Sequence, residues 1–234
     1  MGRRPALDMI ASVEEIAASL RGSRDEGDRS DGYRPLVVDI VRELSLGRPV
    51  RRKRVAELAA KRGVPASTVK RLDGGAEWQD GSIMGVNGLT LLGSRHRLRF
   101  EDVTLGTWCA WDPLFLVPII GRPATSESTS PASGVSLRVK ITPGGVTSAD
   151  PETTVLSVVL PEPTQCCTNV ADVRQAFCQF VNFFEDAHAA AAWLPSHREA
   201  AVLDLDDGFR LARLVYGDLY TDVPVRSMSS THAT

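Results

Sequence analysis

The stretch Trp108-Cys109-Ala110-Trp111-Asp112 places a thiol and a carboxylic acid three positions apart, with a tryptophan before each of them. On a helical turn this spacing brings both side chains to one face, where they can exchange a proton. The apolar run that continues to Ile120 is expected to begin as a helix that Pro118 ends or kinks. The tryptophans are expected to exclude water, which favours a carboxylic acid that keeps its proton until it donates it. The stretch therefore predicts a buried core segment with a proton donor beside a thiol.

A second thiol, Cys178, closes the segment Asp172-Val173-Arg174-Gln175-Ala176-Phe177-Cys178. Soft metal ions prefer thiolate ligands, so Cys109, Cys178 and Asp112 together suggest chemistry on a thiophilic metal. Free cysteines are also frequent core residues, and each of these two could instead be a small buried hydrophobic side chain. Arg174, one turn before Cys178, could stabilise a thiolate or form a structural ion pair.

The composition is typical of a globular protein that buries a core. Of the 234 residues, 43% are hydrophobic and 24% are charged, and the net charge of −2 gives no general attraction to nucleic acid or membranes. The N-terminal apolar segment is broken by Asp8, Glu14 and Glu15, so neither a signal peptide nor a membrane helix is expected. Four cysteines without a small disulfide framework predict free thiols in a reducing cytoplasm.

Residues 1–93 are expected to form a helical module. Apolar stripes predict a helix over about 33–47 and another around Val55–Ala59, and the turn Gly63-Val64-Pro65 leads to a short third helix. A glycine-rich hairpin at Asp80–Gly88 follows. This order is that of a winged helix-turn-helix.

Basic residues give this module a second interpretation, as a DNA-binding domain. Lys70 and Arg71 lie on the candidate recognition helix. A basic cluster precedes it: Arg48, Arg51, Arg52, Lys53 and Arg54. Acidic neighbours oppose this interpretation: Asp73, Glu77 and Asp80. The favoured hypothesis is a module that packs on the catalytic core and covers its entrance. The alternative is a winged-helix transcriptional regulator whose cysteines sense a thiophilic metal.

From about Arg95 the pattern changes to short runs rich in β-branched residues. Strands and helices are predicted from the period of the apolar residues. The predicted strands are Leu98–Val103, Ser136–Ile141 and Thr154–Leu160, and the predicted helices are Val170–Phe184 and Leu203–Tyr220. The Ser/Thr/Pro-rich segment Ala124–Gly134 is expected to be a loop. The predicted fold class is α+β: a winged-helix-like helical module at 1–93, then a mixed α/β catalytic domain with a small sheet at 94–234.

The two cysteine segments and their surroundings resemble the organomercurial lyases, also called alkylmercury lyases. The matching stretches occur in the family's order across roughly residues 33–217. They are Gly88-Leu89-Thr90-Leu91, Trp108–Asp112, Ile120-Gly121-Arg122, Val158-Val159-Leu160-Pro161, and Asp172–Cys178 followed by Phe183-Phe184. Each stretch alone is a weak signal, whereas the ordered set is specific.

The resemblance implies an enzyme that converts R–Hg⁺ into a hydrocarbon and Hg(II). It implies that Cys109 and Cys178 coordinate mercury as thiolates, and that Asp112, in the same mercury site, relays a proton to the alkyl carbon. No cofactor is required in this reaction. Hg(II) stays as the bound product until an external small-molecule thiol or a mercuric reductase accepts it. Neither a membrane nor a nucleic acid is expected as a partner.

Accessory residues are also suggested around this site. Trp108, Trp111 and Arg174 belong to the matching stretches, and the vicinal pair Cys166-Cys167 precedes the second one. Adjacent thiols could capture or hand over mercury, or could be an incidental exposed pair. Many members of the family have a further cysteine after the Gly-Arg motif, whereas Ser126–Ser130 contains none. The histidines lack zinc-ligand spacing: His96, His188, His197 and His232.

Overall fold

The computed structural model describes residues 12–22, 32–159, 169–194 and 200–220. Its helices are α1 (Val13–Gly22), α3 (Tyr33–Leu44), α4 (Arg52–Arg62), α5 (Ala66–Val69), α6 (Leu72–Gly75), α7 (Asp112–Ile120), α8 (Val170–Ala176), α9 (Ala187–Trp193) and α10 (Leu205–Tyr216), with short 3-10 turns η1 (Cys178–Phe180) and η3 (Gly217–Leu219). Its strands are β1 (Val50–Arg51), β2 (Ala76–Gln79), β3 (Ser82–Val86), β4 (Leu89–Thr90), β5 (His96–Arg99), β6 (Thr104–Thr107), β7 (Ala124–Thr129), β8 (Ser136–Thr142), β9 (Gly145–Asp150), β10 (Val155–Val159), β11 (Phe183–Phe184) and β12 (Ala200–Leu203).

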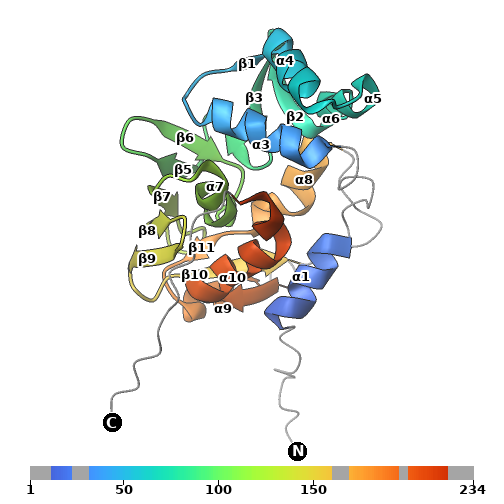
Figure 1. Ribbon diagram of the computed structural model, residues 1–234. Helices are drawn as coiled ribbons and strands as arrows, with labels where there is room; N and C mark the ends of the chain where they lie inside the picture. Colours follow the sequence, from blue (N-terminus) through green and yellow to red (C-terminus); the bar gives the residue numbers. More distant parts are fainter. Residues whose placement is uncertain (1–11, 23–31, 160–168, 195–199, 221–234) are drawn as a thin grey trace, which may run out of the picture.

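Two antiparallel sheets organise the described residues (Figure 1). The larger has nine strands there, in the order β1-β3-β4-β6-β5-β7-β8-β9 with β2 also paired to β3, and the smaller has the order β11-β10-β12. A mixed α/β fold is therefore confirmed; the three-stranded sheet lies within the predicted catalytic segment, whereas the nine-stranded sheet was not predicted. The large sheet continues across residues 93 and 94, between β4 and β5. The division into modules 1–93 and 94–234 stays a prediction.

The sheet is larger than expected partly because β7 lies in a segment predicted to be a loop. Ala124, Ser126 and Ser128 alternate along β7 and are buried, whereas the residues between them are more exposed. The alternation has the period of a strand, but serine side chains give no apolar signal. The loop prediction for Ala124–Gly134 is thus wrong over its first half.

The helices α3, α4, α5 and α6 precede the β2–β3 hairpin, which spans Ala76–Val86 rather than the predicted Asp80–Gly88. The winged-helix arrangement stays a prediction. In Figure 1 these elements form the upper part of the molecule, above strands β5, β7, β8 and β9. Val38, Val41 and Leu44 are among the residues that α3 buries.

No membrane-spanning helix is found in the described part of the chain, because each helix there is too short or too polar for that purpose.

Helix α7 occupies the centre of the core. Its residues from Asp112 to Ile119 are all buried, and the helix contacts α3, β8 and α10. It begins at Asp112 rather than near Cys109, and Pro118 lies inside it without ending it. Figure 1 shows α10 below α7, with α1 packed along α10.

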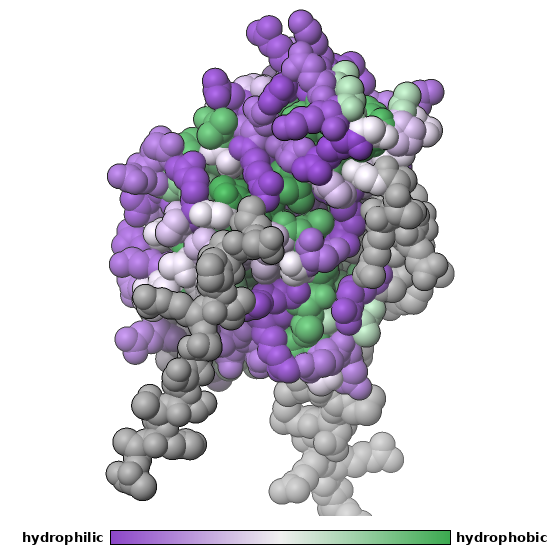
Figure 2. All heavy atoms as spheres, in the orientation of Figure 1, coloured by the Kyte–Doolittle hydropathy of each residue, from purple (hydrophilic) through white to green (hydrophobic). Residues whose placement is uncertain are grey.

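In Figure 2 the visible surface is mainly hydrophilic, with hydrophobic residues in small separate areas.

The segment around Cys178 differs from the predicted continuous helix. Helix α8 ends at Ala176, Cys178 lies on the 3-10 turn η1, and Phe183-Phe184 form β11 against β10. Helical spacing of the phenylalanines favoured a helix to Phe184, but pairing with β10 overrode that local preference.

Candidate active site

Cys109 and Asp112 are brought together by a bend between β6 and α7. The backbone N–H of Cys109 donates to Oδ2 of Asp112 at 2.6 Å. The bend is held by the Thr107 hydroxyl, which donates to the Cys109 carbonyl at 3.0 Å, and by the Ala110 N–H, which donates to the Val181 carbonyl at 3.2 Å. The predicted proximity is present, but a bend rather than a helical turn produces it.

The two thiols of the predicted pair are adjacent. Cys109 and Cys178 are free and buried, at 0% and 3% exposure, and Cys178 is close enough to Cys109 to raise the pKa of that thiol. Burial raises the pKa of the Cys109 thiol well above its ordinary value, and the neighbouring Cys178 and Asp112 raise it further. Cys109 therefore keeps its proton at neutral pH until another cation displaces it.

Asp112 is a buried carboxyl with a titration range near neutrality. Burial raises its pKa to about 7, against the opposing effect of hydrogen bonds from Cys109 and Trp108. Gly88, with a φ of +90°, lies directly against the carboxyl, and a Cβ added there would be 2.6 Å from Cγ of Asp112. Gly88 also accepts a hydrogen bond from the Trp108 N–H at 2.9 Å. The sequence match included Gly88 but assigned it no role; its role is to make room for Asp112.

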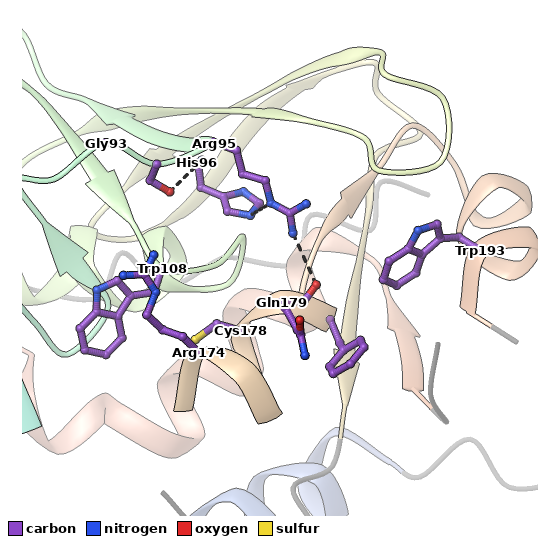
Figure 3. A pocket seen from close by; sticks show the side chains of 10 residues that line it. Gly93, Arg95, His96, Trp108, Arg174, Cys178, Gln179 and Trp193 are labelled. Carbon is purple, nitrogen blue, oxygen red and sulfur yellow. Dashed lines mark hydrogen bonds between the residues drawn. The ribbon is translucent and has the colours of Figure 1, made fainter. Parts of the chain in front are cut away.

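A cavity of about 490 Å³ opens beside the thiols (Figure 3). Its lining residues include Trp108, Arg174, Cys178, Gln179, Phe180, Trp193 and the segment 93–96. Cys178 is the thiol that faces this space, and Cys109 lies next to it without lining it. A ligand entering the cavity therefore meets Cys178 first.

Arg174 is part of an ion pair between the two halves of the chain. It donates to Glu77 on β2, at 2.5 Å, and the Glu77 side chain is only 10% exposed. Glu77 also accepts a hydrogen bond from the Thr90 hydroxyl at 2.5 Å. The positive charge of Arg174 is close enough to Asp112 to lower the pKa of that carboxyl. Of the two roles proposed for Arg174, the structural ion pair is present.

The two tryptophans have different surroundings. Trp108 lines the cavity, and its Nε1 is buried without a hydrogen-bond partner among the described residues. Trp111 points into the core, where Nε1 donates to the Gly208 carbonyl at 3.1 Å. Its ring packs edge-on against Phe115 at a centroid distance of 5.4 Å. Trp108 can contact a ligand, whereas Trp111 fixes the position of α7.

Sequence reasoning missed one polar group on the cavity wall. The Arg95 guanidinium donates through Nε to Nε2 of His96 at 3.0 Å, and through Nη2 to Oδ1 of Asn182. Burial lowers the pKa of His96 to about 3, so this ring is neutral, and its Nδ1 lies 2.7 Å from the Ser128 hydroxyl. Because Nε2 accepts from Arg95, Nδ1 carries the proton and donates to Ser128. The spacing of the histidines gave no signal for this network.

Not all of the predicted accessory residues can be related to the site. Cys166 and Cys167 lie outside the described residues. In the described part of the chain, no three His, Cys, Asp or Glu side chains are grouped to hold a metal ion. The arrangement of Cys109, Cys178 and Asp112 thus offers two sulfurs and one acid.

Two adjacent thiols and an acid that titrates near neutrality, beside an accessible cavity, define a protein that binds a thiophilic ligand and moves a proton next to it. The alkylmercury lyase family model matches residues 89–217, which include all three groups. The chain belongs to the alkylmercury lyase family, a family of enzymes.

Similar proteins and a similar structure support this membership. An alkylmercury lyase of Staphylococcus epidermidis is 34% identical over 211 residues, covering 87% of this chain and 91% of that protein. An alkylmercury lyase of Streptomyces lividans is 30% identical, covering 92% of this chain and 98% of that protein. The mercury-bound form of MerB2 has the same fold, with a TM-score of 0.68 at 18% identity over 89% of this chain and 98% of that chain.

Proposed function

We propose that this chain cleaves the carbon–mercury bond of organomercurials by protonolysis, and that Cys109, Cys178 and Asp112 carry the reaction. The observation that carries the proposal is the pair of buried, neighbouring thiols with the Asp112 carboxyl hydrogen-bonded to the Cys109 N–H. Thiolates bind mercury, and a neutral acid at the same place supplies the proton. Mercury is the substrate's metal here, and no resident cofactor is part of the proposal.

Mercury binding begins at Cys178, because this thiol lines the cavity. Exchange of S–H for S–Hg releases one proton and gives R–Hg–S. Cys109 then transfers its proton to the ionised form of Asp112, which becomes the neutral acid, and forms the second sulfur–mercury bond. The second thiolate donates electron density to mercury, which increases the negative charge on the alkyl carbon.

Asp112 completes the reaction by giving its proton to that carbon. The electron pair of the carbon–mercury bond stays with carbon and takes up the proton, which forms R–H. Mercury remains as Hg(II) on both sulfurs, and an external thiol or a mercuric reductase removes it. A pKa of about 7 suits Asp112 to this task, because an acid near the working pH both accepts and donates a proton readily. Both thiols must stay reduced, and for that reason we propose the cytoplasm as the location.

The N-terminal module is winged-helix-like in this proposal and supports the enzyme rather than binding DNA. Its helix order and β2–β3 hairpin fit that architecture, and Glu77 connects it to Arg174 beside the cavity. Two of the basic side chains that favoured a DNA-binding regulator, Arg52 and Arg54, have acidic partners within the chain. Arg52 pairs with Asp73, and Arg54 pairs with Glu43 and Glu57. Paired charges have less attraction to phosphates, which weakens the regulator hypothesis.

The test is to incubate the full chain with methylmercury and excess 2-mercaptoethanol and to measure methane and Hg(II). We expect equal amounts of both products from the wild type. Cys178→Ser should lose nearly all turnover, because the two sulfurs act as one unit. The control, Cys166→Ser with Cys167→Ser, should retain most of it. Absence of both products, with salt-sensitive binding to a promoter fragment, would establish the regulator instead.

A further inference from the structure

The fold holds Arg95 in a fixed position on the cavity wall. Asn182 and His96, at 0% and 1% exposure, accept hydrogen bonds from the guanidinium, and the Gln179 carbonyl accepts a third at 3.4 Å. His96 is itself held by the buried Ser128. Arg95, in contrast, is exposed to solvent at the cavity. Buried polar groups that are fully hydrogen-bonded rigidify their surroundings, so this network orients an accessible cation.

The charge of Arg95 has no acidic partner among the described residues. Its hydrogen bonds are to an amide oxygen, a carbonyl and a neutral imidazole, and its Nη1 has no partner in the described part of the chain. Arg174, on the same cavity, is paired with Glu77. Among the described residues, the cavity lining includes these two arginines and no carboxylate. Within the described part of the chain, the positive charge of Arg95 is therefore without a carboxylate partner, and Figure 3 shows Arg95 on the same cavity as Cys178.

We propose that Arg95 binds a carboxylate carried by a ligand of the mercury atom, so that the cavity favours anionic substrates. This inference rests on the proposed function and names the substrate class. A guanidinium binds a carboxylate through parallel N–H donors, and Nη1 is available for this contact. Trp108, Phe180 and Trp193 line the same cavity and suit an aromatic group between mercury and the carboxylate. The carboxylate belongs either to the organic group or to a thiol bound to the same mercury.

Alkylation of Cys178 tests the proposal without cleavage. The reagents are 4-(bromomethyl)benzoate and its neutral analogue 4-(bromomethyl)benzamide, and peptide mass spectrometry measures the rate at Cys178 in the full chain. The quantity compared is the rate with the benzoate divided by the rate with the benzamide. This ratio is then divided by the same ratio for a free thiol. Any effect of Arg95 on the thiolate changes both rates equally and cancels in this ratio.

Three variants give the expected pattern. Arg95→Gln should lower the ratio by about three- to tenfold, the effect of a charged pair near a surface. Arg95→Lys keeps the positive charge, so its ratio should remain close to that of the wild type. Arg97→Gln is the matched control, because Arg97 is an exposed cation on β5 that does not line the cavity. An unchanged ratio in Arg95→Gln, or an equal change in Arg97→Gln, overturns the proposal.

Turnover then identifies which molecule carries the carboxylate. KM is measured for 4-carboxyphenylmercury and phenylmercury, each with 2-mercaptoethanol or with mercaptoacetate. If the organic group carries it, Arg95→Gln raises KM only for 4-carboxyphenylmercury; if the thiol carries it, KM rises only with mercaptoacetate. A variant that raises KM equally in all four combinations contradicts anion recognition. A wild type that cleaves neither substrate refutes the proposed function, while the alkylation ratio still decides the carboxylate site.

Discussion

Replacing Asp112 with asparagine should stabilise the folded chain above neutral pH while it removes cleavage. The carboxyl is 5% exposed and its pKa is raised by burial from 3.8 to about 7. The folded state therefore loses stability relative to the unfolded state as the pH rises from 3.8, and the loss is complete above about 7. Asparagine does not titrate, so the variant does not undergo this loss of folding stability.

The size of the effect follows from the pKa of Asp112. One pKa unit corresponds to about 1.4 kcal/mol, so full ionisation of the buried carboxyl costs about 4 kcal/mol of folding free energy. Part of this cost is already present at pH 5. The free-energy cost of ionising Asp112 in the folded state therefore rises by about 2–3 kcal/mol between pH 5 and pH 8. The asparagine amide adds an offset, because its NH₂ group lacks a partner, but that offset does not depend on pH.

Urea unfolding of Asp112→Asn and wild type, both reduced and free of mercury, measures this difference across pH 5–8. The free energy of unfolding of the variant minus that of the wild type should increase with pH by the stated amount. In parallel, methane release should fall by about 10²–10⁴-fold, whereas Hg(II) binding should remain. A stability difference that is flat with pH would show that Asp112 ionises without penalty, and a loss of turnover under about tenfold would mean that another group donates the proton.

Two further substitutions test the surroundings of the acid. Gly88→Ala should lower the free energy of unfolding by about 1–3 kcal/mol and slow cleavage, because its Cβ would clash with Asp112. The control is Gly81→Ala, which is also at positive φ but in open space and should leave cleavage unchanged. Glu77→Gln should destabilise the chain by about 1–2 kcal/mol, because it leaves Arg174 on α8 without a carboxylate partner. The control is Glu57→Gln in an exposed ion pair, which should change stability by less than about 1 kcal/mol. Urea unfolding measures both effects, and equal losses in each variant and its control would contradict the reasoning.

The sequence predicted those elements whose side chains carry a clear apolar period. The strand at Ser136–Ile141 is present as β8, where Leu137, Val139 and Ile141 are buried in alternation. Strand β7 was missed because its buried positions include Ser126 and Ser128, whose side chains give no apolar signal in the sequence. The helix predicted to reach Phe184 shows the opposite error: the apolar period was present, but pairing of strands distant in sequence decided the structure.

The candidate site was predictable only where its residues are close in the sequence or belong to a matching motif. Cys109, Asp112 and Cys178 were found, and the structure places them together. Arg95 and His96 were not found, because their partners come from η1, the residues before β11, and β7. Contacts of this kind depend on the packing of separate elements, and no local spacing encodes them.

Two opposing effects decide the chemistry at Asp112. The residue is the first of α7, where the N-terminus of a helix favours a negative charge by about 0.3–1 kcal/mol at exposed positions. Hydrogen bonds from the Cys109 and Trp108 backbones also favour the ionised form. Removal from water opposes both, and the net rise of the pKa to about 7 means that burial is the larger effect. The same packing of α7 that stabilises the core therefore keeps this carboxyl partly protonated near neutral pH, as the proposed proton transfer requires.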